Sequence, residues 1–238
     1  MTPAPPGAEA AGATGRTMEA RTMYVTIRRY RNWAGPAGEV ARRARDGLVP
    51  ALRAQPGFRL HCAFESEDGA AAVSLTVTDG REQAVRANAE FLQWARTAAG
   101  DLLPHPPEIV AGPCAVCEAR RLSPQPSGSL FVTVRQHHGL GPEERVAPLV
   151  REHVLPLLAG SPGFRAFYSF LDRERPGQGV GVALFDNRAQ ALGANERAVA
   201  AMLDRGIAPY PPRVTAGEAL VLAVAEAAQT EPADAPAA

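Results

Sequence analysis

Several segments of this sequence have the alternating pattern of β-strands, with polar side chains such as arginine, histidine and tyrosine on one face. In MYVTIRRY (23–30), Val25 and Ile27 fall on one strand face, while Arg28 and Tyr30 fall on the other. An arginine in a packed layer of side chains has to be paired or has to face a cavity. A later strand adds His61, a residue type whose ordinary pKa suits proton transfer near neutral pH. These side chains are therefore candidates for a polar binding site.

We expect the β-branched face of each strand to pack on helices and the alternate face to line the interior between two sheets. In the first half of the chain, the interior set is Tyr24, Thr26, Arg28, Tyr30, Arg59, His61, Ser74 and Thr76. In the second half, it is Phe131, Thr133, Arg135, His137, Arg165, Phe167, Ala183 and Phe185. The first set is the more polar. Alternatively, both sets are ordinary residues between packed sheets, some of them at exposed strand ends.

An internal repeat with a period of about 107 residues predicts the elements that position these side chains. MYVTIRRY (23–30) matches LFVTVRQH (130–137), and VPALRAQPGFR (49–59) matches LPLLAGSPGFR (155–165). DGREQAVRANAE (79–90) matches DNRAQALGANER (186–197), and PPEIVAG (106–112) matches PPRVTAG (211–217). Because all four matches fall in one order with nearly constant spacing, we infer a tandem duplication.

Each copy is predicted to be one βαββαβ unit. In the first copy, strands are expected at 24–30, 58–65, 72–78 and 109–117, with helices at 36–54 and 81–98. Pro50 and Pro156 fall inside the first helix of each copy, where a proline kinks the helix or separates its last turn. The predicted fold is α+β, with ferredoxin-like units at 22–118 and 130–226 packed sheet to sheet as an intrachain, pseudo-dimeric barrel. A linker is expected at 119–129 and disordered tails at 1–21 and 227–238.

Composition excludes several classes of partner. Lys and Arg number 25, and Asp and Glu also number 25, so no net positive charge favours nucleic acid. No apolar run is long enough for a signal peptide or a membrane span, so no membrane partner and a cytoplasmic location are expected. The three cysteines give no disulfide framework, and the lone CxxC at 114–117 lies in a predicted strand without a second pair of metal ligands. We therefore expect no metal and interpret Cys62 as a small core residue.

Four segments of the first copy resemble the antibiotic biosynthesis monooxygenase family of dimeric α+β barrels. They are the strand MYVTIRRY, the helix-to-strand segment PGFR (56–59), the helix segment ANAEFLQW (87–94) and the exit PHPPEIVAG (104–112). The resemblance extends over nearly all of both copies. It implies oxygenation without a cofactor: a phenolic or polycyclic, polyketide-like aromatic substrate is deprotonated, and its anion reacts directly with dioxygen to give a quinone.

The resemblance also implies a set of site residues. An Asn and a Trp near the second helix hold the oxygens of the substrate, and here Asn88 and Trp94 fit those positions. Fixed donors of this kind stabilise a developing oxyanion. The candidate catalytic residues are Asn88, Trp94 and His61, and the candidate substrate-binding residues are Arg28, Tyr30, Arg59, Thr76, Arg135 and Arg165. This hypothesis predicts a cavity of roughly 300 Å³ or more, lined by Arg28, Arg59, His61 and Trp94.

Departures from the family pattern keep other functions open. Asn195 repeats Asn88, but Ala201 stands where the first copy has Trp94. Asn88 could instead bind a loop carbonyl, and Trp94 could be a core aromatic residue. The alternatives to an enzyme are a non-enzymatic small-molecule-binding protein and a structural pseudo-dimer with a filled interior. A haem-handling protein would have to use His105, next to the second helix. The chain is expected to be a monomer, as a pseudo-dimer, or a homodimer.

Overall fold

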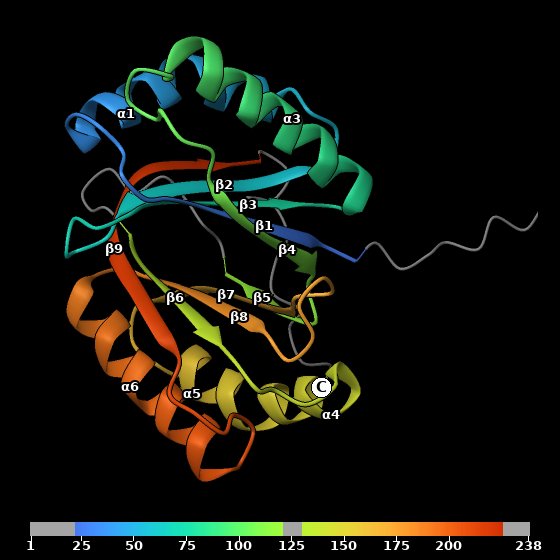
Figure 1. Cartoon of the computed structure of the whole chain (residues 1–238). Helices are drawn as coiled ribbons and strands as arrows, with labels where there is room; N and C mark the ends of the chain where they lie inside the picture. The colour runs from blue at the N-terminus through green and yellow to red at the C-terminus, as the bar shows by residue number, and fades with distance from the viewer. Residues whose placement is uncertain (1–21, 121–129, 226–238) are drawn as a thin grey trace, which may run out of the picture.

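The computed structural model describes residues 22–120 and 130–225, and these form two similar halves packed sheet to sheet. Helices cover the outer face of each sheet, so the helices of the two halves lie on opposite sides of the molecule (Figure 1). The expectations for residues 1–21, 121–129 and 226–238 lie outside the described residues. The predicted α+β fold of two βαββαβ-like halves is confirmed.

The elements of the two halves follow one order. The first half contains β1 (Tyr24–Tyr30), α1 (Ala37–Arg43), the π-helical turn η1 (Ala44–Leu48), α2 (Val49–Arg53), β2 (Phe58–Glu65), β3 (Ala72–Thr78), α3 (Arg81–Ala98), β4 (Glu108–Pro113) and β5 (Val116–Ala119). The second half contains β6 (Phe131–His137), α4 (Glu143–Leu149), the π-helical turn η2 (Val150–Val154), α5 (Leu155–Ala159), β7 (Phe164–Leu171), β8 (Gly179–Phe185), α6 (Arg188–Asp204) and β9 (Arg213–Val224).

The first helix of each half changes its winding just before a proline. Pro50 and Pro156 lie in the first turn of α2 and α5, directly after η1 and η2. A proline has no N–H to donate, and its ring clashes with the carbonyl of the preceding turn, so a wider π-helical turn relieves that contact. The expected kink or separated last turn is not seen as a break, because the helix runs without interruption over 37–53 and over 143–159 and only its winding changes before the proline.

The fourth strand of each copy passes from its own half to the other. The strand order is β4-β1-β3-β2-β9-β6-β8-β7-β5, and neighbouring strands are antiparallel. The first part of β9 pairs with β6 and its last part pairs with β2. In the same way, β4 pairs with β1, whereas β5 pairs with β7 of the second half. The two halves are therefore joined through exchanged strands at both crossings.

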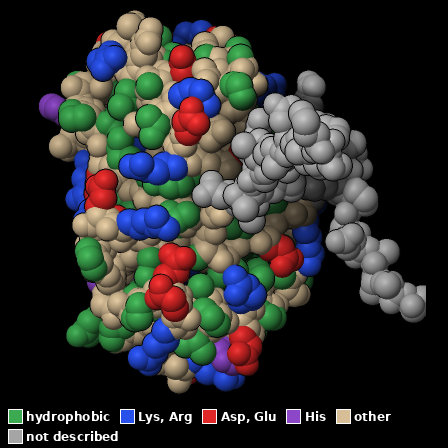
Figure 2. Space-filling model, turned by 90° about the vertical axis from the view of Figure 1, so that its right-hand side faces the viewer, with side chains coloured by type: hydrophobic (Ala, Val, Ile, Leu, Met, Phe, Trp, Pro, Cys, Tyr) green, Lys and Arg blue, Asp and Glu red, His purple; other side chains and the backbone are tan. Residues whose placement is uncertain are grey.

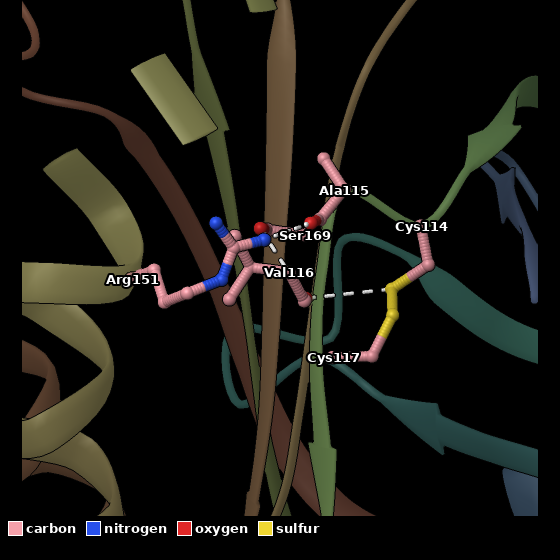
Figure 3. Close-up of a disulfide and its surroundings, with 6 residues drawn as sticks. All are labelled: Cys114, Ala115, Val116, Cys117, Arg151 and Ser169. Carbon is pink, nitrogen blue, oxygen red and sulfur yellow. Dashed lines mark hydrogen bonds between the residues drawn. A yellow bond between two sulfur atoms is a disulfide. The ribbon is translucent and has the colours of Figure 1, made fainter. Parts of the chain in front are cut away.

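The strand predicted at 109–117 is interrupted, and this corrects the expectation for the cysteines. β4 ends at Pro113, β5 begins at Val116, and a disulfide joins Cys114 to Cys117 (Figure 3). In a continuous strand, residues three apart point to opposite faces. The break between β4 and β5 removes this restriction for Cys114 and Cys117. The expectation of no disulfide was therefore wrong. Cys62 is a buried free thiol in the core, as predicted.

The predicted assignment of strand faces was also wrong. Val25 and Ile27 belong to the apolar core between the two sheets, together with Val132 and Val134 from the second half. The alternate face of β1 meets the helices instead, because Arg28 contacts Asn88 of α3. The interior between the sheets is enclosed on both sides and takes the most apolar faces. The polar faces lie against helices whose inward positions are mostly alanine, which leaves room for long side chains.

Candidate functional site

Arg28 is a buried cation at the centre of the first sheet–helix interface. Its side chain is 0% exposed, and its Nε donates a hydrogen bond to Oδ1 of Asn88 at 2.8 Å. Its Nη1 donates to Oγ1 of Thr76 at 3.0 Å, and its guanidinium lies 4.4 Å from the ring centre of Phe91. No acidic side chain among the described residues pairs with it. Burial lowers the pKa of Arg28 to about 10, so the group is still charged at neutral pH.

A small cavity lies beside this cation, between the first sheet and its helices. Its volume is about 50 Å³. Its walls are largely apolar, but they include Tyr30, His61, Ser74 and Trp94. Four buried atoms of these side chains have no hydrogen-bond partner among the described residues: the Tyr30 hydroxyl, Nε2 of His61, Oγ of Ser74 and Nε1 of Trp94. Polar groups buried in this way favour a ligand that offers oxygen atoms.

His61 connects the cavity to Arg28 through Thr76. Nδ1 of His61 lies 3.1 Å from Oγ1 of Thr76, which already accepts a hydrogen bond from Arg28. Thr76 Oγ1 thus contacts both Arg28 and His61, while Nε2 of His61 has no hydrogen-bond partner among the described residues. Burial, followed by the charge of Arg28, lowers the pKa of His61 to about 3. His61 is thus neutral near pH 7, and its role as acceptor of the substrate proton stays a prediction that this lowered pKa does not favour.

Arg59 and Arg165 lie outside the two cavities. Nε of Arg59 donates to Oδ1 of Asp79 at 2.5 Å, and Nε of Arg165 donates to Oδ1 of Asp186 at 2.5 Å. Both arginines are partly exposed at strand ends, where these carboxylates satisfy their charge. The structure brings Asn88, Trp94, His61, Arg28, Tyr30 and Thr76 together, but it does not bring Arg59 or Arg165 to them. The expected cavity of roughly 300 Å³ lined by Arg28 and Arg59 is not found either.

The second half repeats the buried arginine with a more apolar surrounding. Nη1 of Arg135 donates to Oδ1 of Asn195 at 3.2 Å. The positions of His61, Ser74 and Thr76 are taken by Phe167, Gly181 and Ala183. The cavity beside Arg135 has a volume of about 40 Å³, and Arg135 itself lines it. The sequence interpretation assigned Arg135 to a cavity between the sheets and did not recognise this pair.

Each cavity is closed by the strand that arrives from the other half. Leu220 and Val221 of β9 line the first cavity, and Ala115, between β4 and β5, lines the second. Arg45 donates from Nη1 to the Leu220 carbonyl at 2.8 Å, and its counterpart Arg151 donates from Nη2 to the Ala115 carbonyl at 3.1 Å (Figure 3). We call residues 220–221 and 115–116 the caps of the first and second cavities. Sequence periodicity gave no signal for them.

An open groove adjoins the first cavity. Its volume is about 1000 Å³, and it shares Trp33, Ala37, Glu65 and Leu220 with the cavity lining. Charged residues of both signs line the groove, among them Glu67 and Arg188, which form an ion pair. The face of the molecule in Figure 2 likewise shows positive and negative side chains intermixed. The groove and the first cavity therefore lie side by side, with Trp33 and Leu220 in the lining of both.

The fold is that of the dimeric α+β barrels. No family model matches the sequence, and no curated protein resembles it closely enough to be recognised. A proposed monooxygenase from Fusobacterium nucleatum has a TM-score of 0.66 at 9% identity, covering 85% of this chain and 94% of that one. A proposed monooxygenase from Lactobacillus acidophilus gives 0.65 at 11% identity, with 85% and 96% covered. An anthrone oxidase-like protein gives 0.52 at 12% identity, with 87% and 95% covered. Identities this low show the shared fold alone.

The candidate haem ligand lies away from both sheet–helix cavities. His105 is exposed in the loop after α3 and lines neither sheet–helix cavity. The cavities lined by His61 and His137 have volumes of about 50 and 40 Å³. Sites for cofactor-sized ligands measure roughly 300 to 1,000 Å³, so neither cavity fits a macrocycle. Among the described residues, no group of three or more metal-ligating side chains occurs, and no helix is long and apolar enough to cross a membrane.

Proposed function

We propose that this protein binds a small phenolic or anthrone-like aromatic molecule in the first cavity and oxygenates it with dioxygen without a cofactor. The observation that supports this most directly is the buried charge of Arg28, which no acidic side chain among the described residues pairs and which Thr76 links to His61 in the cavity wall. A buried cation without a carboxylate is costly, and an anionic ligand offsets that cost. Phenols become anions when such a site lowers their pKa from about 10.

Donors around the cavity fit a ligand oxygen that gains charge. Nε2 of His61, Nε1 of Trp94 and the Tyr30 hydroxyl are buried without partners among the described residues. Preorganised donors in a dry site stabilise an oxyanion more strongly than water does. Phe91 lies between Arg28 and the cavity and meets Trp94 edge to face, with ring centres 5.7 Å apart. These rings supply an aromatic wall against which a flat substrate would stack.

The chemistry balances without a further reactant. An anthrone gives up a proton to form its enolate, and the carbon of that anion adds dioxygen to give a peroxide. Loss of water from the peroxide converts the original methylene into a carbonyl, so one oxygen atom enters the quinone and the other leaves as water. Burial lowers the pKa of His61, which makes it a poor acceptor, so we expect the first proton to leave for solvent on the groove side.

The volume of the first cavity limits how the substrate binds. At about 50 Å³ it holds only part of an aromatic ring system. Trp33 and Leu220 separate the cavity from the groove, because both residues line both spaces. We therefore expect the substrate to place its oxygen-bearing edge beside His61 and to displace Trp33 or Leu220 toward the groove.

Oxygen consumption tests this proposal. Purified protein is mixed with a panel of anthrones and phenols, including 1,8-dihydroxyanthrone, in air-saturated buffer without added cofactor. We expect oxygen uptake that falls at least tenfold in Trp94→Ala, which removes the Nε1 donor beside the cavity. We also expect a fall in Asn88→Ala, which removes the acceptor that positions Arg28. The matched variant Asn195→Ala alters the second half and is expected to keep the activity. No uptake above the uncatalysed rate across the panel would refute the enzymatic proposal.

A non-enzymatic binding protein is the second candidate. The small, closed first cavity and the low basicity of His61 favour it. It predicts that 1,8-dihydroxyanthrone raises the melting temperature of the protein without oxygen uptake. An increase in melting temperature that disappears in Trp94→Ala would support this function over catalysis.

A further inference from the structure

We propose that the second half contains a separate binding site for a short-chain carboxylate such as acetate or propionate, located in the second cavity beside Arg135. This site is distinct from the first cavity, because the apolar core between the two sheets separates them. It does not depend on oxygenase activity. The argument rests on the polar atoms of the second cavity, its size and its cap.

Two buried polar side chains of β6 line the second cavity. Arg135 is 2% exposed and His137 is 5% exposed. Nη2 of Arg135 and Nδ1 of His137 have no hydrogen-bond partner among the described residues. Arg135 uses Nη1 for Asn195, and its guanidinium lies 5.7 Å from the ring centre of Phe167. No acidic side chain among the described residues pairs with it, so the second cavity has an uncompensated positive charge.

Gly181 opens the second cavity to this charge. In the first half, Ser74 lies opposite Arg28 and lines the cavity, whereas Arg28 does not. In the second half, Gly181 lies opposite Arg135, and both line the cavity. A Cβ at Gly181 would lie 3.4 Å from Nε and Nη2 of Arg135. The missing side chain is thus what exposes the guanidinium to a ligand in the second half.

Size and charge select a short monocarboxylate. A buried water needs roughly 10–15 Å³, so a cavity of about 40 Å³ has room for about three such positions, close to the size of acetate or propionate. One negative charge balances one guanidinium, and a carboxylate can accept hydrogen bonds from Arg135 and from His137 together. The remaining walls, which include Val146, Val150 and Met202, suit a short alkyl group. A phosphate dianion would be larger, would leave an excess negative charge and has no alkyl part for these walls.

The cap of the second cavity forms one of its walls. Ala115 lines the cavity, its amide donates to the Ser169 carbonyl at 2.8 Å, and its carbonyl accepts from Arg151. The disulfide joins the residues on either side of this cap, Cys114 and Cys117 (Figure 3). The equivalent strand over the first cavity contains Ala219 and Leu222 at these positions and has no such link. One wall of the second cavity is therefore formed by a disulfide-linked segment.

Titration with sodium propionate tests the proposal on the intact chain. Amide shifts are followed in ¹H–¹⁵N spectra at constant ionic strength, with sodium chloride as the salt control. We expect saturable shifts at Ala115, Gly181 and Met202, and a dissociation constant at least tenfold weaker in Arg135→Met, as for loss of a charged hydrogen bond. The matched variant Arg28→Met is expected to leave the dissociation constant unchanged.

A second variant guards against loss of folding in Arg135→Met. Gly181→Ser keeps the charge but places the first-half side chain in the cavity, and we expect it to weaken propionate binding, whereas Ser74→Gly does not. Absence of saturable shifts in the wild-type protein would overturn the proposal. Equal affinity in Arg135→Met, or shifts confined to residues around the first cavity, would also overturn it.

Discussion

Nε of Arg28 donates a hydrogen bond to Oδ1 of Asn88 at 2.8 Å, and the pair spans 60 residues of sequence. Arg135 and Asn195 form the same pair across 60 residues in the second half. In each half, a buried guanidinium is thus hydrogen-bonded to one asparagine of the long helix, α3 or α6, although the other neighbours of the guanidinium differ. The aromatic and hydroxyl groups differ between the halves, so the two cavities share a buried cation but have different linings.

Removing the asparagine is expected to destabilise either half. Asn88→Ala leaves Nε of Arg28 buried without its acceptor, which costs about 1–3 kcal/mol. Asn195→Ala is expected to have a similar effect through Arg135. The free energy of unfolding, measured by urea denaturation, checks both values. A Glu196→Ala change, at an exposed position of α6, provides the control. Unchanged stability in Asn88→Ala would show that the pair contributes little.

The pH dependence of stability is expected to report the neutral state of His61. Its pKa falls from 6.5 to about 3 on folding, so the unfolded chain binds more protons between these values. The free energy of unfolding therefore decreases as the pH falls from 6.5 toward 3, by at most about 1.4 kcal/mol per pH unit for this group. His61→Phe introduces the residue type found at Phe167 and is expected to reduce that slope. Denaturation curves at several pH values measure it, and an unchanged slope in the variant would contradict the assignment.

Tryptophan fluorescence is expected to report occupancy of the first cavity. The chain has two tryptophans, and both Trp33 and Trp94 line that cavity. Binding of 1,8-dihydroxyanthrone should quench their emission, and Trp94→Phe should remove most of the change. Propionate, which we assign to the second cavity, should leave the emission unaltered. Quenching that is the same in Trp94→Phe and the wild type would place the aromatic ligand elsewhere.

Reduction of the disulfide is expected to loosen the cap of the second cavity. Without the link between Cys114 and Cys117, the Ala115 amide is held by its bond to the Ser169 carbonyl and by the neighbouring strand pairs. We expect faster hydrogen exchange at Ala115 in the double variant Cys114→Ser/Cys117→Ser, and weaker propionate binding. Exchange at Val221, in the other cap, serves as the internal control. Equal exchange of Ala115 in both proteins would show that the disulfide does not brace the cap.

The repeat predicted the architecture because four matched segments recur in the same order. The assignment of strand faces failed at Val25 and Arg28, because alternation separates two faces without showing which one meets the helices. Asn88, Trp94 and His61 were nevertheless predicted to lie together, and the structure places them in one half beside Arg28. The equal spacing of Arg28 from Asn88 and of Arg135 from Asn195 was a usable signal for the second pair.

Strand exchange and the disulfide could not be predicted. Residue periodicity shows that 109–117 is extended, but it does not show that its end pairs with β7 of the other half. The break at Cys114 and Ala115 could not be predicted for the same reason. It occurs where the chain passes from one half to the other, and no local turn residue marks it. Pairing between distant segments has to be known before the position of either cap can be deduced.

The exchanged strands also affect how the two halves can diverge. In a symmetric dimer of identical chains, one gene segment would encode both caps, so a change in one would always appear in the other. Here the two caps, 115–116 and 220–221, are encoded separately. The residues that flank them are Cys114 and Cys117 in one segment and Ala219 and Leu222 in the other. A disulfide could therefore arise beside the second cavity while the cap of the first cavity stayed without one. A duplicated chain can in this way carry two copies of one cavity and change the cap of each copy independently.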